Sequence, residues 1–118
     1  MQIREAAARS GVAPKTIRYY EEVGLVAAPA RTEGGYRDYD ESELATLAFV
    51  KRARDLGFSL KDVSALLDLW RNQNRSSAEV KSLTERHIAD IEHRMSELSR
   101  MRDTLRTLAV QCHGDDRP

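Results

Sequence analysis

Basic and aromatic side chains gather in the first forty residues at spacings that suit contact with nucleic acid. Lys15, Arg18 and Tyr19 fall within one turn of a predicted helix that begins at Pro14, so they can reach phosphates and base edges together. Each cation that neutralises a phosphate adds salt-dependent affinity, although a single Lys or Arg is more often a solvated surface charge. The residues predicted to contact DNA are Lys15, Arg18, Tyr19, Tyr20, Arg31, Tyr36, Arg37 and Arg54.

The single cysteine, Cys112, is the second candidate for chemistry. A thiolate is a soft ligand that selects Cu(I) and related ions, but one cysteine alone makes a poor metal site. It cannot form a disulfide within the chain, which agrees with a reducing compartment. His113 adjoins it, and we assign no metal role to His113, His87 or His93.

Length, charge and motif content exclude several classes of protein. The 118 residues suffice for one domain, and no HExxH, GxSxG, P-loop or GxGxxG motif of an enzyme is present. The net charge is zero, with 19 basic and 19 acidic residues, so an argument for DNA binding must rest on local clusters. No apolar run approaches the ~20 residues of a membrane span, and no secretory signal begins the chain. We therefore expect a cytoplasmic protein that is not an enzyme and does not contact a membrane.

Two short helices and a hairpin must position the basic cluster. Gly11 ends the first helical pattern, and Pro14 and Gly24 bracket the second. Two helices on either side of a short turn outline a helix-turn-helix. The Gly34-Gly35 pair then suits a tight turn flanked by two short strands. Residues 1–39 are therefore predicted to form a winged helix-turn-helix.

Capping signatures predict a connecting helix pair within residues 40–75. Asp40 and Glu43 form a capping box, and Ser59 with Asp62 repeats the signature ahead of a second helix. The buried faces are predicted to include Leu44, Leu47, Ala48, Val50 and Leu56 in the first helix, and Leu60, Val63, Leu66, Leu67 and Trp70 in the second. The polar segment 71–75 is predicted to be a connection.

A long amphipathic helix is predicted over residues 76–111, with Ser76 and Glu79 as a capping pair. Its apolar positions advance from Val80 to Leu108 with a mean step of 3.5 residues, the period of a coiled coil. A helix of some 35 residues spans about 52 Å, more than so small a domain can cover, so the stripe needs a partner chain. We expect a homodimer in which two such helices pair. The predicted interface residues are Ile91, Leu98, Met101, Leu105 and Leu108.

The runs IRYYEEVGLV, RTEGGYRDYDESEL and RARDLGFSLKDVSALL, followed by the long helix, resemble the MerR family of bacterial transcriptional activators over essentially the whole chain. The resemblance implies a mainly α fold with a winged helix-turn-helix, a connecting helix pair and a long C-terminal helix that forms an antiparallel coiled-coil dimer. It also implies a homodimer that binds a palindromic promoter spacer and distorts the DNA so that RNA polymerase can use it. Such distortion costs several kcal/mol, which phosphate contacts on both half-sites would supply.

Within this family, the tail CHGDDRP resembles the copper-efflux branch, in which two cysteines eight residues apart hold one monovalent ion. Cys112 matches the first ligand, and the second falls at position 120, past Pro118. Residues 112–118 are thus predicted to be the start of a metal-binding loop that is cut short. A serine at the start of the long helix, as at Ser77, marks the Cu(I), Ag(I) and Au(I) branch, where divalent-metal sensors carry a cysteine from the partner protomer. The other interpretation of Ser77 is helix capping.

The sequence therefore predicts a metal-responsive activator that senses Cu(I) or another monovalent coinage metal, Ag(I) or Au(I). Its partners are promoter DNA, RNA polymerase and a second copy of the chain. The alternative is a MerR-type regulator of another signal, either a divalent metal or no metal at all.

Overall fold

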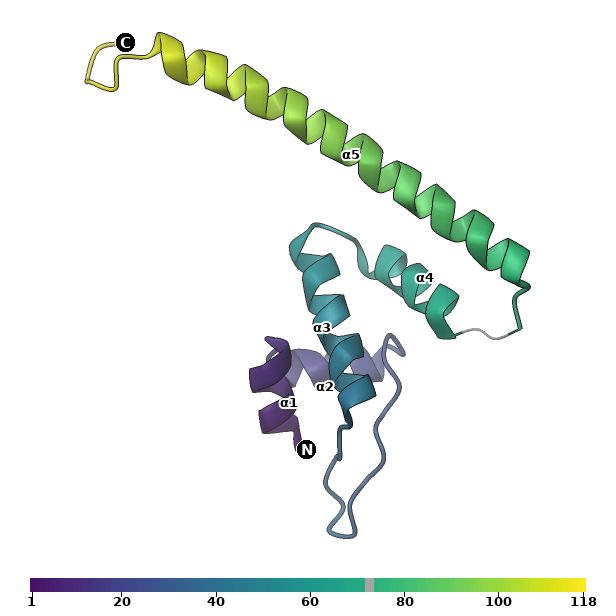
Figure 1. Cartoon of the computed structure of the whole chain (residues 1–118). Coiled ribbons are helices and arrows are strands. Elements are labelled where there is room, and N and C mark those ends of the chain that lie inside the picture. The colour runs from purple at the N-terminus through teal and green to yellow at the C-terminus, as the bar shows by residue number, and fades with distance from the viewer. Residues whose placement is uncertain (72–73) are drawn as a thin grey trace. The chain divides into compact units, whose positions relative to one another are not determined.

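The computed structural model describes residues 1–71 and 74–118. They belong to two compact units, Met1–Arg71 and a carboxy-terminal unit that is described from residue 74 on. Five helices make up most of the described residues (Figure 1). The mainly α fold class predicted from the sequence is confirmed.

The amino-terminal unit begins with a pair of short helices, α1 (Ile3–Ser10) and α2 (Pro14–Glu22). Gly11 ends α1 with a φ of +79°, and its N–H donates to the Ala7 carbonyl at 2.9 Å. Glycine adopts this left-handed conformation without the penalty that a Cβ atom brings. Pro14 occupies the start of α2, where a missing N–H costs nothing. Both boundaries agree with the sequence prediction.

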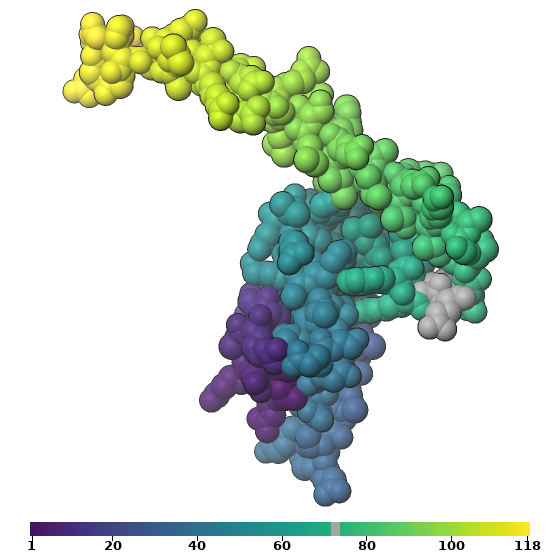
Figure 2. Space-filling model, in the orientation of Figure 1, coloured from purple at the N-terminus to yellow at the C-terminus, as the bar shows by residue number. Residues whose placement is uncertain are grey.

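Residues 27–39 form a hairpin, here called the wing, that tapers away from the helices of its unit (Figure 2). The prediction of two short strands is wrong, because the described residues contain a single antiparallel bridge, between Arg31 and Arg37, in place of a strand pair. Two backbone hydrogen bonds flank it: Thr32 N–H donates to Tyr36 at 2.8 Å, and Asp38 N–H donates to Ala30 at 2.9 Å. A two-stranded hairpin with so little pairing is only marginally stable by itself, so contacts with the rest of the unit must hold it in place.

The helices α3 (Glu41–Asp55) and α4 (Leu60–Arg71) follow the wing. The predicted capping box opens α3, since Asp40 accepts from the Glu43 N–H at 2.8 Å and Glu43 accepts from the Asp40 N–H at 3.3 Å. The Ser59 hydroxyl accepts from the Asp62 N–H at 3.1 Å at the start of α4. These local hydrogen bonds satisfy donors that a helix start leaves open.

The core of this unit lies where α1, α2, α3 and α4 meet. Its fully buried side chains are Ile17, Val50, Val63, Leu47 and Leu67. Burying such a side chain contributes about 1.5–3 kcal/mol, so these contacts are the main source of stability. Two predicted core residues are exposed. Leu56 follows the last helical residue of α3 and is 68% exposed, and Trp70 is 66% exposed with its ring against Phe49 at 5.2 Å.

The carboxy-terminal unit consists mainly of α5 (Ser77–Gln111). Ser76 caps it by accepting from the Glu79 N–H at 3.1 Å, as predicted. None of its residues is buried, and its large apolar side chains from Ile88 to Leu108 are exposed. None of the helices in the described parts of the chain is long and apolar enough to cross a membrane.

Candidate nucleic-acid interface

The two faces of α2 differ in what they expose. Ile17 is fully buried and Tyr20 is 7% exposed, so this side packs into the core. Lys15, Arg18 and Tyr19 are exposed on the other side. The burial of Tyr20 runs against its predicted contact with DNA, because residues three apart share a helix face and Tyr20 therefore follows Ile17 inward.

The wing supplies a second set of exposed groups. Tyr36 is 63% exposed beside the turn. Arg31 is exposed as well, and its Nη1 donates to the Gly35 carbonyl at 2.9 Å across the hairpin. Gly35 itself has a φ of +82°, which suits a glycine in a tight turn. Arg31 therefore stabilises the turn that presents Tyr36.

A small hollow of about 130 Å³ lies between the wing and the first two helices. Three arginines line it: Arg18 on α2, and Arg31 and Arg37 on the two limbs of the wing. Its other lining residues are Gln2, Ile3, Gly35 and Tyr36. Guanidinium groups form charge-assisted hydrogen bonds with phosphate oxygens. The hollow thus brings four of the predicted DNA contacts together around a space fit for a phosphate.

The other four predicted contacts do not line this hollow: Tyr19 and Tyr20, described above, and Lys15 and Arg54. Lys15 is in the first turn of α2 and does not line it. Arg54 lies in the last turn of α3, at the opposite end of that helix from the wing, and donates to the Phe58 carbonyl at 2.9 Å (Figure 1). The structure therefore separates Arg54 from the wing arginines, and its DNA contact remains a prediction.

A carboxylate that the sequence analysis passed over joins α2 to the wing. Glu21 has a side chain only 6% exposed, and it accepts from Arg37 Nε at 2.8 Å and from the Tyr39 hydroxyl at 2.5 Å. Burial, and then the hydrogen bond to Glu21, raise the pKa of Tyr39 well above its ordinary value of 10.0. The signal was present in the sequence, because Glu21 lies four residues after Ile17 and so belongs to the inward face.

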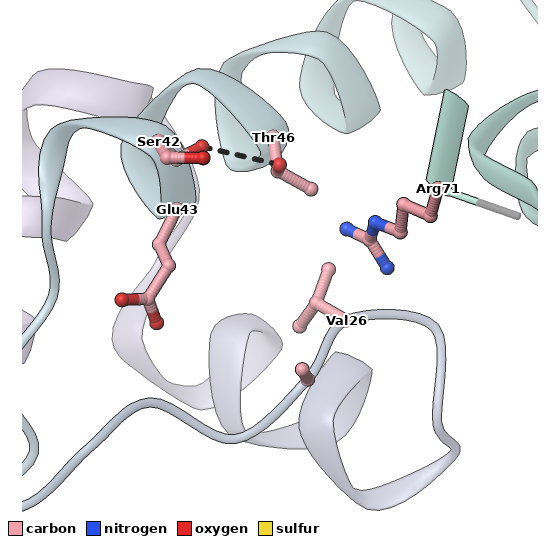
Figure 3. Close-up of a pocket in the computed structure, with 6 residues that line it drawn as sticks. Val26, Ser42, Glu43, Thr46 and Arg71 are labelled. Atoms are coloured by element: carbon pink, nitrogen blue, oxygen red, sulfur yellow. Dashed lines mark hydrogen bonds between the residues drawn. The ribbon is translucent and has the colours of Figure 1, made fainter. Parts of the chain in front are cut away.

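A second hollow, of about 180 Å³, lies where the end of α4 approaches the start of α3. Arg71 and Glu43 lie on opposite sides of it, and Val26 lies between them (Figure 3). Arg71 donates to the Leu25 carbonyl at 3.4 Å, and the Thr46 hydroxyl donates to the Ser42 carbonyl at 3.2 Å. One cation facing one carboxylate is less suited to an anionic backbone than three arginines. Burial raises the pKa of Glu43, which also closes the capping box of α3.

The residues predicted to sense metal lie at the two ends of α5. Ser77 is its first residue, and Cys112 follows its last residue with an exposed, free thiol. A 35-residue helix separates them by about 50 Å, so one chain cannot bring both to a single ion. Cys112 fits a soft metal as one thiolate, and the described residues hold no cluster of three or more metal-binding side chains.

Comparison with known protein families covers nearly the whole sequence. Residues 1–70 match the family described as "MerR HTH family regulatory protein". Residues 44–108 match the family described as "MerR, DNA binding".

Related proteins align along the full chain. An uncharacterised HTH-type transcriptional regulator of Pseudomonas aeruginosa is 50% identical over 100% of this chain and 89% of its own length. The heavy metal-dependent transcription regulator 2 of Rhizobium meliloti is 49% identical over 100% of this chain and 80% of its own length. The HTH-type transcriptional regulator CueR of Salmonella typhimurium is 44% identical over 98% of this chain and 84% of its own length.

Solved structures resemble the fold. A MerR family regulator from Listeria monocytogenes superposes with a TM-score of 0.80, at 27% identity, over 96% of this chain and 87% of its own. HiNmlR, solved bound to promoter DNA, gives a TM-score of 0.77 at 26% identity over 92% of this chain and 86% of its own. PbrR691 from Ralstonia metallidurans, solved in complex with lead(II), gives a TM-score of 0.60 at 35% identity over 100% of this chain and 91% of its own.

Proposed function

The chain belongs to the MerR family of helix-turn-helix transcriptional regulators, and from this premise we propose that it activates transcription as a homodimer that distorts a palindromic promoter spacer on sensing Cu(I) or another monovalent coinage metal. Proteins of this family are DNA-binding regulators and not enzymes. The proposal has three parts, which concern DNA, the dimer and the metal signal.

The DNA part is carried by the three-arginine hollow. Arg18 on α2 and Arg31 on the wing can bind the same phosphate from two directions. The exposed side chains of Lys15 and Tyr19 on α2 are then free to reach the neighbouring groove, while Tyr36 extends the contact along the backbone. HiNmlR, solved on promoter DNA, has a similar fold. Two such units on one palindrome would supply enough contacts to stabilise bent DNA, which RNA polymerase could then use.

The dimer part is supported by the exposed stripe of α5. Ile91, Leu98, Met101, Leu105 and Leu108 are each more than a third exposed in the single chain. A row of large apolar side chains open to water along one helix is typical of an interface. The 3.5-residue period favours a second helix of the same kind as the partner, and the MerR resemblance implies an antiparallel pair.

The metal part is supported by Cys112 and by the relatives. An exposed thiol at the end of α5 is accessible to an ion, and the Rhizobium meliloti relative is named a heavy metal-dependent regulator. Ser77 adds no negative charge, which suits a monovalent ion held by thiolates. Since one chain contributes a single thiolate at the end of α5, we propose Cys112 as one ligand of the ion and assign no second ligand.

A divalent signal is the second candidate. The observation that favours it is the lead(II) complex of PbrR691, which is 35% identical to this chain. A neutral hydroxyl at Ser77 is a weaker ligand for a divalent ion than a thiolate, so we rank this candidate below Cu(I).

The test combines gel shift with run-off transcription. A palindromic promoter fragment and a scrambled one of equal length are titrated with the protein, with and without buffered Cu(I), Ag(I) or Pb(II). We expect the palindrome to be bound with and without metal, and transcription to rise with Cu(I) or Ag(I). Cys112→Ser should abolish the rise, whereas the adjacent His113→Gln should retain it. Equal transcription with and without each metal would refute the metal response while leaving DNA binding intact, and a rise with Pb(II) alone would favour the second candidate.

A further inference from the structure

Glu21 is a buried acidic group on the helix that faces DNA in the proposed function. Its side chain is 6% exposed, at the end of α2 nearest the wing. A buried carboxylate is costly unless hydrogen bonds and an opposite charge compensate it. Glu21 receives both kinds of compensation from the wing, through Arg37 and Tyr39.

The two donors lie on the outgoing limb of the wing, on either side of Asp38. The main chain of this limb is held as well, since the Tyr39 N–H donates to the Met1 carbonyl at 2.7 Å and the Asp38 N–H donates to Ala30 at 2.9 Å. The wing has only one bridging residue pair of its own. Contacts with the rest of the unit therefore hold the wing. The Met1 amine donates to Asp38 Oδ1 and to the Tyr39 carbonyl at 2.9 and 2.7 Å, and the Glu21 carboxylate of α2 accepts two side-chain hydrogen bonds from the wing.

Arg37 connects this contact to the three-arginine hollow, where we propose that a phosphate binds. Its Nε binds Glu21, and the residue also lines the hollow that it shares with Arg18 and Arg31. A guanidinium group has five N–H donors in a rigid plane. Holding one edge on Glu21 thus fixes the plane and leaves the other edge for an anion.

We infer that Glu21 is a positioning residue: it sets the wing against α2 and orients Arg37 in the three-arginine hollow, so that helix and wing bind neighbouring parts of one DNA site. Glu21 itself does not touch DNA. The inference rests on the proposed DNA binding only for its effect on affinity, because the position of the wing can be measured without DNA.

Glu21→Gln is the test variant, and Glu22→Gln is its matched control. The glutamine keeps the size of the side chain but loses the charge. Its oxygen can still accept from Arg37 Nε, and its NH₂ group can donate to the Tyr39 oxygen, so the contact that is lost is the ion pair with Arg37. Glu22 is an exposed carboxylate one residue further along, and its replacement removes the same charge from the same turn. Any effect of charge alone must therefore appear in both variants.

The first measurement is amide hydrogen exchange of the wing in the DNA-free protein. We expect the Thr32 and Asp38 amides to exchange about tenfold faster in Glu21→Gln, the factor for a hydrogen bond whose acceptor loses its charge. Glu22→Gln should match the wild type. Wild-type exchange rates in Glu21→Gln would overturn the inference.

The second measurement is operator affinity and the hydroxyl-radical footprint, well below the melting temperature of each variant. If charge alone acted, both variants would bind more tightly, because each removes a negative charge near phosphates. We expect Glu21→Gln instead to bind about tenfold more weakly and to lose protection where the wing lies, with protection by α2 retained. Tighter or unchanged binding by Glu21→Gln would overturn the inference.

Tyr39→Phe keeps the test decisive if Glu21→Gln unfolds. It removes one donor and leaves the ion pair with Arg37. The wing amides should therefore exchange faster and the operator should be bound more weakly, both by smaller factors than in Glu21→Gln. The absence of both changes would overturn the inference. If the wild type binds no DNA, the proposed function fails, while the exchange rates still decide the role of Glu21.

Discussion

Leu98 offers the sharpest test of the proposed dimer. It lies in the middle of the α5 stripe and is 69% exposed in the single chain. Fully burying a leucine side chain contributes about 1.5–3 kcal/mol, so covering this one would contribute about 1–2 kcal/mol. A twofold interface contains the residue twice. Leu98→Ala should therefore weaken association by about 2–4 kcal/mol, which raises the dimer dissociation constant about thirtyfold to several hundredfold.

Sedimentation equilibrium over a wide range of protein concentration measures that constant directly. Val110→Ala is the matched control, because Val110 is an apolar residue of the same helix, 86% exposed, and lies off the stripe. We expect it to dissociate like the wild type. Equal dissociation constants for Leu98→Ala and the wild type would refute the assignment of the stripe as the interface. A wild type that is monomeric throughout would refute the dimer itself.

Three further predictions concern the amino-terminal unit. Arg18→Ala should weaken operator binding and lower the salt slope by about 1, since one phosphate contact is lost; wild-type binding in gel shift would refute its placement in the hollow. Asp40→Ala should lower the free energy of unfolding by about 1 kcal/mol, measured in urea, because the Glu43 N–H loses its acceptor; an unchanged value would contradict the role of this cap. The raised pKa of Tyr39 implies a phenol that stays protonated in the fold above pH 10.0. The stability that this phenol contributes is therefore complete below pH 10.0 and is lost as the pH rises towards the pKa of Tyr39 in the folded protein. In urea melts above pH 10.0, the free energy of unfolding should fall more steeply with pH in the wild type than in Tyr39→Phe. Equal slopes would contradict the raised pKa.

The helix boundaries could be predicted from the sequence because they are set by short-range chemistry. Gly11 ends α1 through its own backbone conformation. Asp40 and Glu43 need only each other to open α3. The long helix followed in the same way from a cap at Ser76 and an unbroken periodic pattern.

The sequence-based predictions failed where tertiary contacts decide which residues are buried or paired. Leu56 fits the helical pattern of α3, yet the helix ends at Asp55 and leaves it exposed. The flanks of the wing turn were predicted to be strands, but Arg31 and Arg37 form a single bridge there. Arg37 and Tyr39 also bind Glu21 on α2, a contact that turn chemistry cannot reveal. Tyr19 and Tyr20 are adjacent and similar, and only the packing of α2 tells which of them faces water. The hollow could not be predicted at all, since it depends on three segments meeting in space.

A net charge of zero is compatible with DNA binding because of where the charges are paired. Arg9 binds Glu41 through two hydrogen bonds at 2.9 and 3.0 Å, and Lys51 binds Asp55 at 2.6 Å. Within the hollow, Arg37 forms an ion pair with a carboxylate, that of the buried Glu21. Arg31 instead donates to a backbone carbonyl, which leaves its charge uncompensated. The acidic residues of these two exposed pairs thus neutralise cations outside the hollow, while Arg31 keeps its positive charge where we propose that a phosphate binds.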